Sequence, residues 1–430
     1  MFKRLFWVFL VAALLAACSG EQSQTTPTWT LVPTQAQNQA QAQGQSAAQE
    51  NTATVAPASA TPSATSTPAA TNTPKPTFTP SPTQPTATPT SDLIGPANFP
   101  AENNPLTGLP AADPALLNRR PIAIKVNLVP RNYYRPPWGL SLADIVFDYY
   151  HNDGYSRLHA IFYGNDAAMV GPIRSGRMPD GDLVRMYKSI FAYGSADSRI
   201  NSRFFNSDYA DRLILERGAD PCPPTVEKPM CRFEPAGYNH LVAGTKELSQ
   251  YMTDKKVDNS RPNLSGMTFQ TIPPQGGSAN QQVIVHYSID NYASWQYDAA
   301  TGVYLRFQDK VMAQSGQEEY EPLTDRLNDQ QISARNVVVI LAPHTYYTPP
   351  PGEIVEITLE GSGKAYAYRD GLMYEVAWNR PAYDSVLYLT FPDGSAYPFK
   401  PGNTWFQIVN DLAKISQPDA ATWRFDFFIP

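Results

Sequence analysis

Residues 143–164 read ADIVFDYYHNDGYSRLHAIFYG, and this stretch decides the class of fold. In its second half, 156–164, two sets of side chains alternate: Leu158, Ala160 and Phe162 against His159, Ile161 and Tyr163. An alternation of period two is typical of a β-strand, because successive side chains point to opposite faces. The first half, 143–150, and the earlier PIAIKVN at 121–127 also predict strands, so we expect a sheet here.

Helical segments follow this predicted sheet. One helix is indicated by an apolar stripe formed by Leu183, Met186, Tyr187 and Ile190. Asp180 or Asp182 is expected to cap its start. A short strand and a turn over 191–198 and helices over 201–213 and 244–252 complete the pattern. Strands mixed with helices predict an α/β (α+β) domain for residues 101–275.

From about Gln281 the apolar residues repeat with period two. The predicted strands are QVIVHYS, GVYLRF, NVVVILA, EIVEITL, KAYAYR, LMYEVAW, SVLYLTF and TWFQIV. Asp370-Gly371 and Asp393-Gly394 are typical of tight hairpin turns. We therefore expect a smaller, antiparallel β-rich domain at 280–415, separated from the first domain within 271–281. Three tryptophans on these strands are expected in its core: Trp295, Trp378 and Trp405.

The N-terminus indicates an extracytoplasmic protein. A basic MFKR precedes an apolar stretch too short to span a bilayer, and LAAC ends at Cys18. This pattern predicts a lipoprotein signal peptide over 1–18, with Cys18 lipidated; an ordinary secretory signal is the alternative. Residues 19–100 carry only four charges and are rich in Gln, Thr and Pro, which predicts a disordered linker.

The net charge and the number of cysteines further limit the classes of function that the sequence allows. The net charge is −6 and no basic block occurs, which argues against a nucleic-acid partner. Cys222 and Cys231 are the other two cysteines, and in this compartment they predict a disulfide. The five histidines lack metal-ligand spacing and no catalytic or cofactor motif is present, so neither metal, cofactor nor catalytic residues are predicted. His240 with Asp197 is the one acid/base pair worth testing.

GPIRSGR, residues 171–177, is the candidate binding segment. Glycines let backbone approach a ligand, and two guanidinium groups bind an anion bidentately. The predicted anion-binding residues are Arg157, Arg174, Ser175, Gly176, Arg177, Asp197 and Arg199, and Ser195 is a further candidate. A cell-wall carboxylate, a teichoic-type phosphate or an acidic sugar fits such a site. In the alternative interpretation the arginines pair internally with Asp144, Asp148 or Asp153.

NYYRPPWG, residues 132–139, is a candidate aromatic platform. Tyr133, Tyr134 and Trp138 surround a rigid Pro pair, and aromatic rings on a loop can stack on sugars. Packing under the loop is the alternative.

Several of these segments together resemble a known family. NPLTGLP (104–110), RPIAIKVN (120–127), GYSRLHAIF (154–162) and GPIRSGR are similar to the N-terminal domain of the YerB-like bacterial lipoproteins, and PGNTWFQIV (401–409) is similar to their C-terminal domain. The resemblance implies a lipid-anchored protein with an α/β sandwich at the N-terminal side, and implies no reaction. The chain departs from the family pattern at Asn152-Asp153-Gly154 and at Asn239-His240-Leu241.

The sequence thus predicts a lipid-anchored protein of the bacterial cell envelope. We expect a binding or scaffolding module for peptidoglycan, an anionic glycopolymer or an envelope protein. A cell-wall hydrolase or transferase that uses the arginines is the alternative, and a purely structural role is a third.

Overall fold

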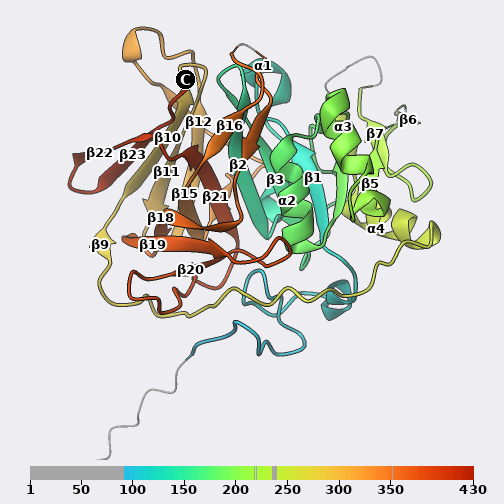
Figure 1. The fold of residues 1–430 in the computed structure, drawn as a ribbon, viewed down its shortest axis with the longest axis horizontal. Coiled ribbons are helices and arrows are strands. Elements are labelled where there is room, and N and C mark those ends of the chain that lie inside the picture. The colour runs from blue at the N-terminus through green and yellow to red at the C-terminus, as the bar shows by residue number, and fades with distance from the viewer. Residues whose placement is uncertain (1–91, 217, 219, 235–239, 351) are drawn as a thin grey trace, which may run out of the picture. The chain divides into compact units, whose positions relative to one another are not determined.

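The three strands predicted first lie side by side in the computed structural model, which describes residues 92–430 except 217, 219, 235–239 and 351 (Figure 1). They are β1 (Ile122–Val126), β2 (Ile145–Asn152) and β3 (Tyr155–Phe162). β3 pairs antiparallel with both β1 and β2. Every side chain of β1 is buried, as expected for a strand covered on both faces. The strand prediction for this region is confirmed.

This sheet extends in both directions from β3. On one side β1 pairs in parallel with β4 (Ile190–Tyr193), which pairs with β5 (Leu213–Leu215). On the other side β2 pairs in parallel with β21 (Thr404–Asn410). Within the described residues the sheet has eleven strands. The others are β9 (Ser278–Ala279), β15 (Asn336–Ala342), β18 (Gly361–Arg369), β19 (Leu372–Arg380) and β20 (Tyr388–Thr390).

The sheet runs across the predicted boundary at 271–281. Its central pair, β2 and β21, joins a strand of the first predicted domain to a strand of the second. Two further links cross the same boundary. In the first, Arg306 of β12 (Val303–Asp309) forms a buried ion pair with Asp148 at 2.9 Å. In the second, Arg131 and Arg135 each form an ion pair with Asp309 at 2.8 Å. The described residues accordingly belong to one compact unit.

A second sheet is built from the C-terminal part of the chain. Its strands are β10 (Gln282–Ser288), β11 (Asn291–Asp298), β12, β13 (Tyr320–Pro322), β14 (Ser333–Ala334), β22 (Lys414–Asp419) and β23 (Thr422–Asp426). Most pairings after residue 281 are antiparallel as predicted, while β15 with β21 and β10 with β23 are parallel. Trp295, Trp378 and Trp405 are buried, which confirms their predicted place in the core.

Tight turns and short strands complete the architecture. Asp370 and Gly371 both have positive φ between β18 and β19, as a two-residue hairpin requires. The short strands are β6 (Asp220–Pro221), β7 (Met230–Arg232), β8 (Leu241–Ala243), β16 (His344–Tyr346) and β17 (Val355–Ile357).

The α-helices lie in the N-terminal half of the described chain. They are α1 (Arg131–Tyr134), α2 (Met178–Tyr187), α3 (Ser198–Phe205) and α4 (Thr245–Asp254). α2 begins earlier than predicted, because Pro179 occupies its first turn and Asp180 accepts the backbone N–H of Arg177. Asp180 is thus the third residue of the helix, and neither it nor Asp182 is the N-cap. α3 also begins earlier than the predicted 201, because the Asp197 side chain caps it.

The N-terminal end of the described chain is part of the same unit. Ile94 pairs with Phe269, and both pack in or against the hydrophobic core. The compact unit therefore includes residues before 100, the predicted end of the linker. Cys18 and the rest of the signal peptide lie outside the described residues. Among the helices that the structure describes, none has the length and apolar character needed to cross a membrane.

Candidate anion-binding site

The segment 171–177 is a bend whose backbone is hydrogen-bonded on both sides. The Arg174 N–H donates to the carbonyl of Lys125 in β1 at 3.0 Å, and the Gly176 N–H donates to the carbonyl of Ser195 at 2.7 Å. A Cβ on Gly176 would lie 2.9 Å from the ring of Phe204, so only glycine fits there. The bend is therefore fixed between β1 and the loop after β4.

Three arginine side chains gather at this bend. Arg157 in β3 donates to the Ser175 carbonyl at 3.0 Å. Arg177 donates to the carbonyls of Ser175 at 3.4 Å and Gly176 at 3.0 Å. Arg174 donates to the hydroxyl of Tyr134 and lies over its ring, 5.1 Å from the centroid. We call Arg157, Arg174 and Arg177 the arginine cluster; all three side chains are partly buried. The structure thus brings these predicted site residues together.

The predicted alternative, internal pairing with three aspartates, is wrong. Asp144 accepts the backbone N–H groups of Tyr163 and Gly164, Asp148 pairs with Arg306, and Asp153 accepts the Gly352 N–H. Each of these carboxylates therefore has its partner outside the bend.

Two of the arginines carry charges that no carboxylate neutralises directly. Within the part of the chain that the structure describes, neither Arg157 nor Arg177 forms an ion pair with Asp or Glu. The Nε of Arg157 is buried and has no hydrogen-bond partner. Burial, with Arg177 and Arg174 nearby, holds the pKa of Arg157 well below its usual value. Arg157 and Arg177 therefore carry positive charge that no directly paired carboxylate compensates.

His151 lies against the arginine cluster. Its Nδ1 accepts a hydrogen bond from Nε of Arg177 at 3.3 Å. Burial, followed by the charges of Arg157 and Arg177, holds the pKa of His151 well below the usual value. His151 is therefore neutral near pH 7 and adds no further positive charge to the cluster.

A buried polar network lies beneath the cluster. Asp180 accepts hydrogen bonds from Lys125 at 3.1 Å, from His159 at 2.9 Å and from the Tyr149 hydroxyl. Its second oxygen accepts the backbone N–H of Arg177 at 2.6 Å. Burial lowers the pKa of Lys125 to about 7, against the opposing attraction of Asp180. Asp180 therefore fixes the end of the bend and the start of α2 together.

A small cavity opens beside Arg174. Its volume is about 80 Å³, and it is lined by Ile173, Arg174, Ser175, Gly194, Ser195, Glu216, Arg232 and Leu241. The hydroxyls of Ser175 and Ser195 are 2.9 Å apart at its wall. Glu216 is occupied, because it accepts the Gly218 N–H at 2.8 Å and lies 3.6 Å from Arg232. The cavity offers hydroxyl and guanidinium donors to a small group.

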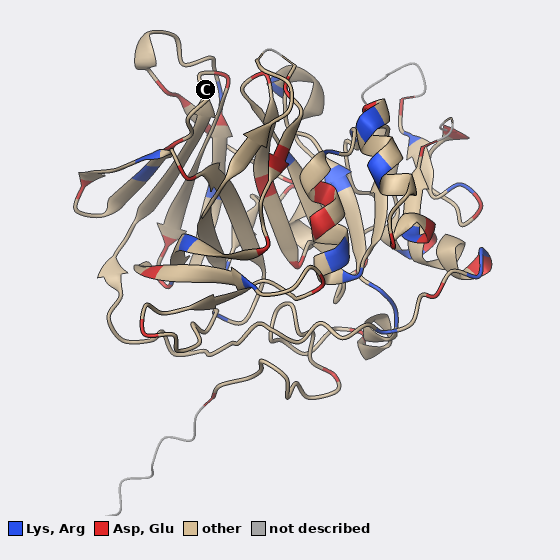
Figure 2. Cartoon of the chain, viewed as in Figure 1, with Lys and Arg blue, Asp and Glu red and all other residues tan. Residues whose placement is uncertain are grey.

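Two predicted site residues lie at the surface instead. Asp197 and Arg199 are exposed and pair with each other at 3.0 Å, while Asp197 caps α3. Figure 2 shows acidic and basic residues close together along α2. His240 stacks on Phe233, with ring centroids 4.4 Å apart, and lies 3.0 Å from Glu234, so no acid/base pair with Asp197 is formed.

The three predicted platform aromatics do not form one exposed surface. Tyr133 is 65% exposed, whereas Tyr134 is buried against Arg174. Trp138 packs edge-on against Phe233, with ring centroids 5.6 Å apart. Successive positions on the short α1 point in different directions, so one tyrosine faces out and its neighbour faces in. Tyr134 instead orients an arginine of the cluster.

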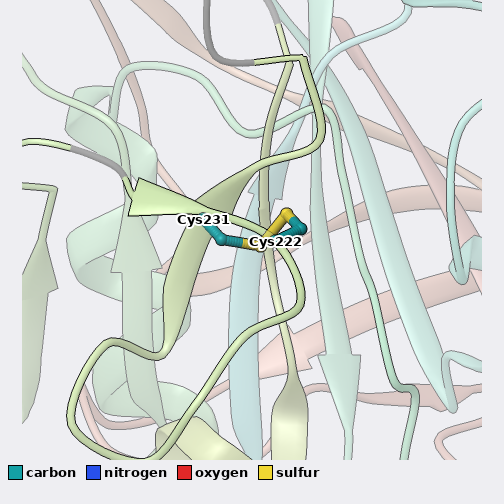
Figure 3. The surroundings of a disulfide bond; sticks show 2 residues. All are labelled: Cys222 and Cys231. Atoms are coloured by element: carbon teal, nitrogen blue, oxygen red, sulfur yellow. A yellow bond between two sulfur atoms is a disulfide. The ribbon is translucent and has the colours of Figure 1, made fainter.

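The disulfide between Cys222 and Cys231 is present, as predicted (Figure 3). It ties the start of the loop to β7, whose last residue is Arg232. Since Arg232 lines the cavity beside Arg174, the crosslink lies next to the candidate site.

Sequence reasoning missed the buried part of the site. Lys125, Tyr149, His159 and Asp180 were not predicted as site residues, nor were Glu216 and Arg232. Alternation within a strand indicates which of its residues share a face. It does not show which charged side chains of different strands are in contact. The described residues hold no cluster of three or more His, Cys, Asp or Glu side chains arranged for a metal ion.

Fold and site together define a mixed α/β, strand-rich protein with a cationic bend at one end of its largest sheet. Residues 106–258 match the family described as "Protein of unknown function (DUF3048) N-terminal domain", and residues 283–406 match the C-terminal domain of the same family. The two matches cover most of the chain, which belongs to this family.

One relative, compared both by its sequence and by its crystal structure, agrees with this assignment and with the predicted resemblance. "Putative lipoprotein YerB" of Bacillus subtilis (strain 168) is 27% identical over 313 residues, covering 72% of this chain and 86% of that protein. The crystal structure of the YerB protein from Bacillus subtilis matches with a TM-score of 0.57 and 25% identity, covering 72% of this chain and 97% of the other.

Proposed function

We propose that this chain is a lipid-anchored binding protein of the bacterial cell envelope, and that its arginine cluster binds an anionic group of an envelope component. The similar Bacillus protein is named a lipoprotein, and the signal-like N-terminus with Cys18 supports the same location here. Residues 19–91, extended as polyproline II, would reach up to about 225 Å from the membrane. Peptidoglycan, an anionic glycopolymer and an envelope protein are the candidate partners.

The uncompensated charge of Arg157 and Arg177 carries this proposal. Partly burying a cation without a carboxylate costs stability, and proteins usually avoid it by pairing the charge. The cost is understandable where a ligand supplies the missing negative charge. Removing charged groups that serve binding commonly stabilises a protein, which reflects the same trade-off.

Binding to isolated cell walls tests the proposal. The compact unit, residues 92–430, is sedimented with walls that keep their anionic polymers and with walls stripped of them. We expect retention on the intact walls, and at least tenfold weaker retention for Arg157→Gln/Arg177→Gln, since each lost charged hydrogen bond is worth about 1.5–3 kcal/mol. Arg203→Gln is the matched control, because Arg203 is exposed on α3 and pairs with Glu356.

Two results would count against the proposal. One is absence of retention on any wall preparation. The other is equal retention of the double variant and Arg203→Gln, since nonspecific charge would then explain the binding.

A second candidate function is a cell-wall hydrolase or transferase. It is favoured by one contact, that of His151 with Arg177, because an arginine beside a histidine is an arrangement used in group transfer. His151 is only 4% exposed, however, and its pKa is held well below the usual value, which favours binding. Incubation with muropeptides and lipid-linked precursors, followed by mass spectrometry, tests it. Turnover that is lost in His151→Gln would replace the binding function with catalysis.

A further inference from the structure

We propose that a second site, at the amino ends of the central strands, binds a sugar ring that carries a carboxylate. Two sequence motifs that the proposed function does not use meet there: NPLTGLP (104–110) and the PGNT that begins 401–409. The Gly402 N–H donates to the carbonyl of Thr107 at 2.8 Å and so joins the two motifs. This inference goes beyond the proposed function and does not depend on the arginine cluster.

The sheet topology brings the site together. β15, β21 and β2 are adjacent parallel strands, so their amino ends lie at one edge of the sheet. Three of the lining segments directly precede these strands, and a fourth follows the antiparallel β3 at the same edge. They line a cavity of about 350 Å³, within the range of about 300–1,000 Å³ for small-molecule pockets. The lining residues come from 104–112, 141–144, 164–165, 333–335 and 402–403.

Arg335 has an unoccupied guanidinium edge. It is the one cation among the described residues that line the cavity. Its Nη1 donates to the carbonyl of Thr301 at 3.1 Å, while its Nε and Nη2 have no partner within the described part of the chain. Nε–H and Nη2–H point the same way and form the fork that binds both oxygens of a carboxylate. The nearby Lys400 is paired with Asp370 and does not line the cavity.

Neighbouring residues hold Arg335 in place. Its backbone N–H donates to Oδ1 of Asn403 at 3.0 Å, and Nδ2 of Asn403 donates to the carbonyl of Ser333 at 2.8 Å. A Cβ on Gly402 would lie 2.3 Å from Cγ of Arg335, so the arginine stem packs directly against the glycine backbone. The guanidinium group is therefore presented from a fixed backbone.

The charge of the site fits a single carboxylate. Asp144 is the other charged side chain among the described lining residues, and no ion pair joins it to Arg335. It is 3% exposed, and one of its oxygens accepts the N–H groups of Tyr163 at 2.5 Å and Gly164 at 2.8 Å. An amino acid would bring an ammonium group with no free carboxylate to meet it. A phosphate monoester would bring a second negative charge with no second cation in the lining.

The rest of the lining favours a sugar ring over a bare acid. Hydroxyl and amide groups match the hydroxyls of a sugar, and the lining supplies them from Thr107, Ser141, Asn165 and Ser333. The stretch 109–112, Leu-Pro-Ala-Ala, gives an apolar wall that can cover the C–H face of a ring. A volume at the lower end of the range suits one ring and not an extended chain.

Titration of residues 92–430, followed by NMR, tests the ligand class. Methyl glucuronide, methyl glucoside, acetate and glucose 6-phosphate are added at pH 7.5 and constant ionic strength. We expect methyl glucuronide to bind at least about tenfold more tightly than the glucoside, which lacks the charged hydrogen bonds. It should also bind more tightly than acetate, which lacks the ring, and than glucose 6-phosphate.

Variants of Arg335 assign the binding to this site. Arg335→Gln should bind methyl glucuronide and methyl glucoside equally, because the fork and its charge are lost. Arg335→Lys keeps the charge without the fork and should have an intermediate affinity for the glucuronide. Arg203→Gln is the matched control and should bind like the unsubstituted protein, because Arg203 is exposed and pairs with Glu356. Circular dichroism of each variant verifies its fold.

A second pair of sugars distinguishes the source of the ligand. N-acetylmuramic acid, which carries its carboxylate on a lactyl ether, stands for peptidoglycan, and N-acetylglucosamine is its neutral counterpart. Methyl glucuronide stands for an acidic glycopolymer. Preference for the acid in either pair supports the inference, and the pair with the stronger preference identifies the source.

Failure of this inference is separable from failure of the proposed function. Equal affinity for acid and neutral sugar in both pairs would overturn the inference, as would an acid preference that persists in Arg335→Gln. Binding of acetate or glucose 6-phosphate as tight as that of the best sugar acid would overturn it too. Arg157→Gln/Arg177→Gln should keep its affinity for the sugar acid while it loses wall retention. Loss of sugar-acid binding in that double variant would place the acid at the arginine cluster and refute a second site.

Discussion

Arg157 shows how a single side chain can reveal a binding role. Its guanidinium donates to one carbonyl, its Nε has no partner, and two other arginines lie close by. A residue selected for stability alone would have acquired an acidic neighbour. The position of Arg157 is therefore explained better by ligand binding than by a contribution to stability.

This interpretation predicts that Arg157→Gln stabilises the unliganded protein. Removing a cation that is repelled by Arg174 and Arg177 should raise the free energy of unfolding by about 1 kcal/mol and the melting temperature by a few degrees. Thermal unfolding in phosphate-free buffer measures this. Arg185→Gln is the control, because Arg185 pairs with Asp208 at 2.7 Å and gains nothing from removal. A clear fall in the melting temperature of Arg157→Gln would show that the charge is compensated after all.

The pKa of Lys125 predicts a pH-dependent affinity. The pKa is lowered to about 7 by burial, with Asp180 raising it and Arg157 and Arg177 lowering it. Below pH 7 the ammonium form adds a positive charge beneath the cluster, and above pH 7 that charge is lost. Affinity for a tetrahedral dianion of constant charge, sulfate, should therefore fall by about fivefold from pH 6 to pH 8.

His151 provides the control for this titration. Because its pKa is held well below the usual value, it stays neutral throughout this range, and His151→Gln should keep the same pH dependence. A sulfate affinity that is constant from pH 6 to pH 8, or that rises, would contradict the assigned role of Lys125.

At the scale of single residues, the sequence indicated the arginines of the bend but not the buried polar network beneath them. Two arginines three residues apart beside glycine predicted an anion site with Arg157 as a further member, and in the structure Arg157 donates to the carbonyl of Ser175 in the same bend. Nothing in the local pattern around Lys125, Tyr149 or Asp180 indicated that they meet, because their contacts join β1, β2 and α2. Tyr134 was predicted as a ligand contact, but it orients Arg174 instead.

At the scale of elements, boundaries were less predictable than element types. α2 and α3 were both expected, yet each begins earlier in the structure, because the first turn is set by side-chain capping from Asp180 and Asp197. Apolar periodicity locates the buried stripe of a helix and says little about its first residue. The same capping contact gives α2 a role in the site, since it fixes the backbone of Arg177.

The crosslinked loop gives a prediction at the same scale. Breaking the bond between Cys222 and Cys231 should lower the free energy of unfolding by about 2–3 kcal/mol, because a closed loop restricts the unfolded chain. Thermal unfolding with and without reductant measures the effect. Cys222→Ser/Cys231→Ser should show the lower stability in both conditions. An equal further loss in that variant on adding reductant would mean that the reductant acts elsewhere.

At the scale of the whole molecule, strand content was predictable and strand order was not. The period-two alternation of apolar residues predicted the strands on both sides of 271–281, but it cannot show which strands are neighbours in the sheet. The parallel pairing of β2 with β21 links residues about 260 positions apart in register, such as Asp148 and Gln407. No local pattern in the sequence predicts such a pairing.

The shared sheet predicts that the two halves are unstable when separated. In the fragment 92–275 the edge of β2 is unpaired, and Asp148 loses its buried partner Arg306, a defect that typically costs about 3–5 kcal/mol. We expect neither 92–275 nor 276–430 to unfold cooperatively alone, and a mixture of the two to regain a cooperative transition. Calorimetry and amide NMR spectra measure this. A sharp transition and a dispersed spectrum for 92–275 alone would contradict it.

The β2–β21 seam has a consequence for how such genes can evolve. Two modules joined end to end can be exchanged, duplicated or lost separately, whereas halves that interlock through one hydrogen-bonded ladder must be inherited together. A recombined protein folds only when the new β2 and β21 pair in the same register. It must also keep the Asp148–Arg306 ion pair and an acidic partner like Asp309 for the arginine of α1. Natural shuffling of either half into an unrelated protein should accordingly be rare.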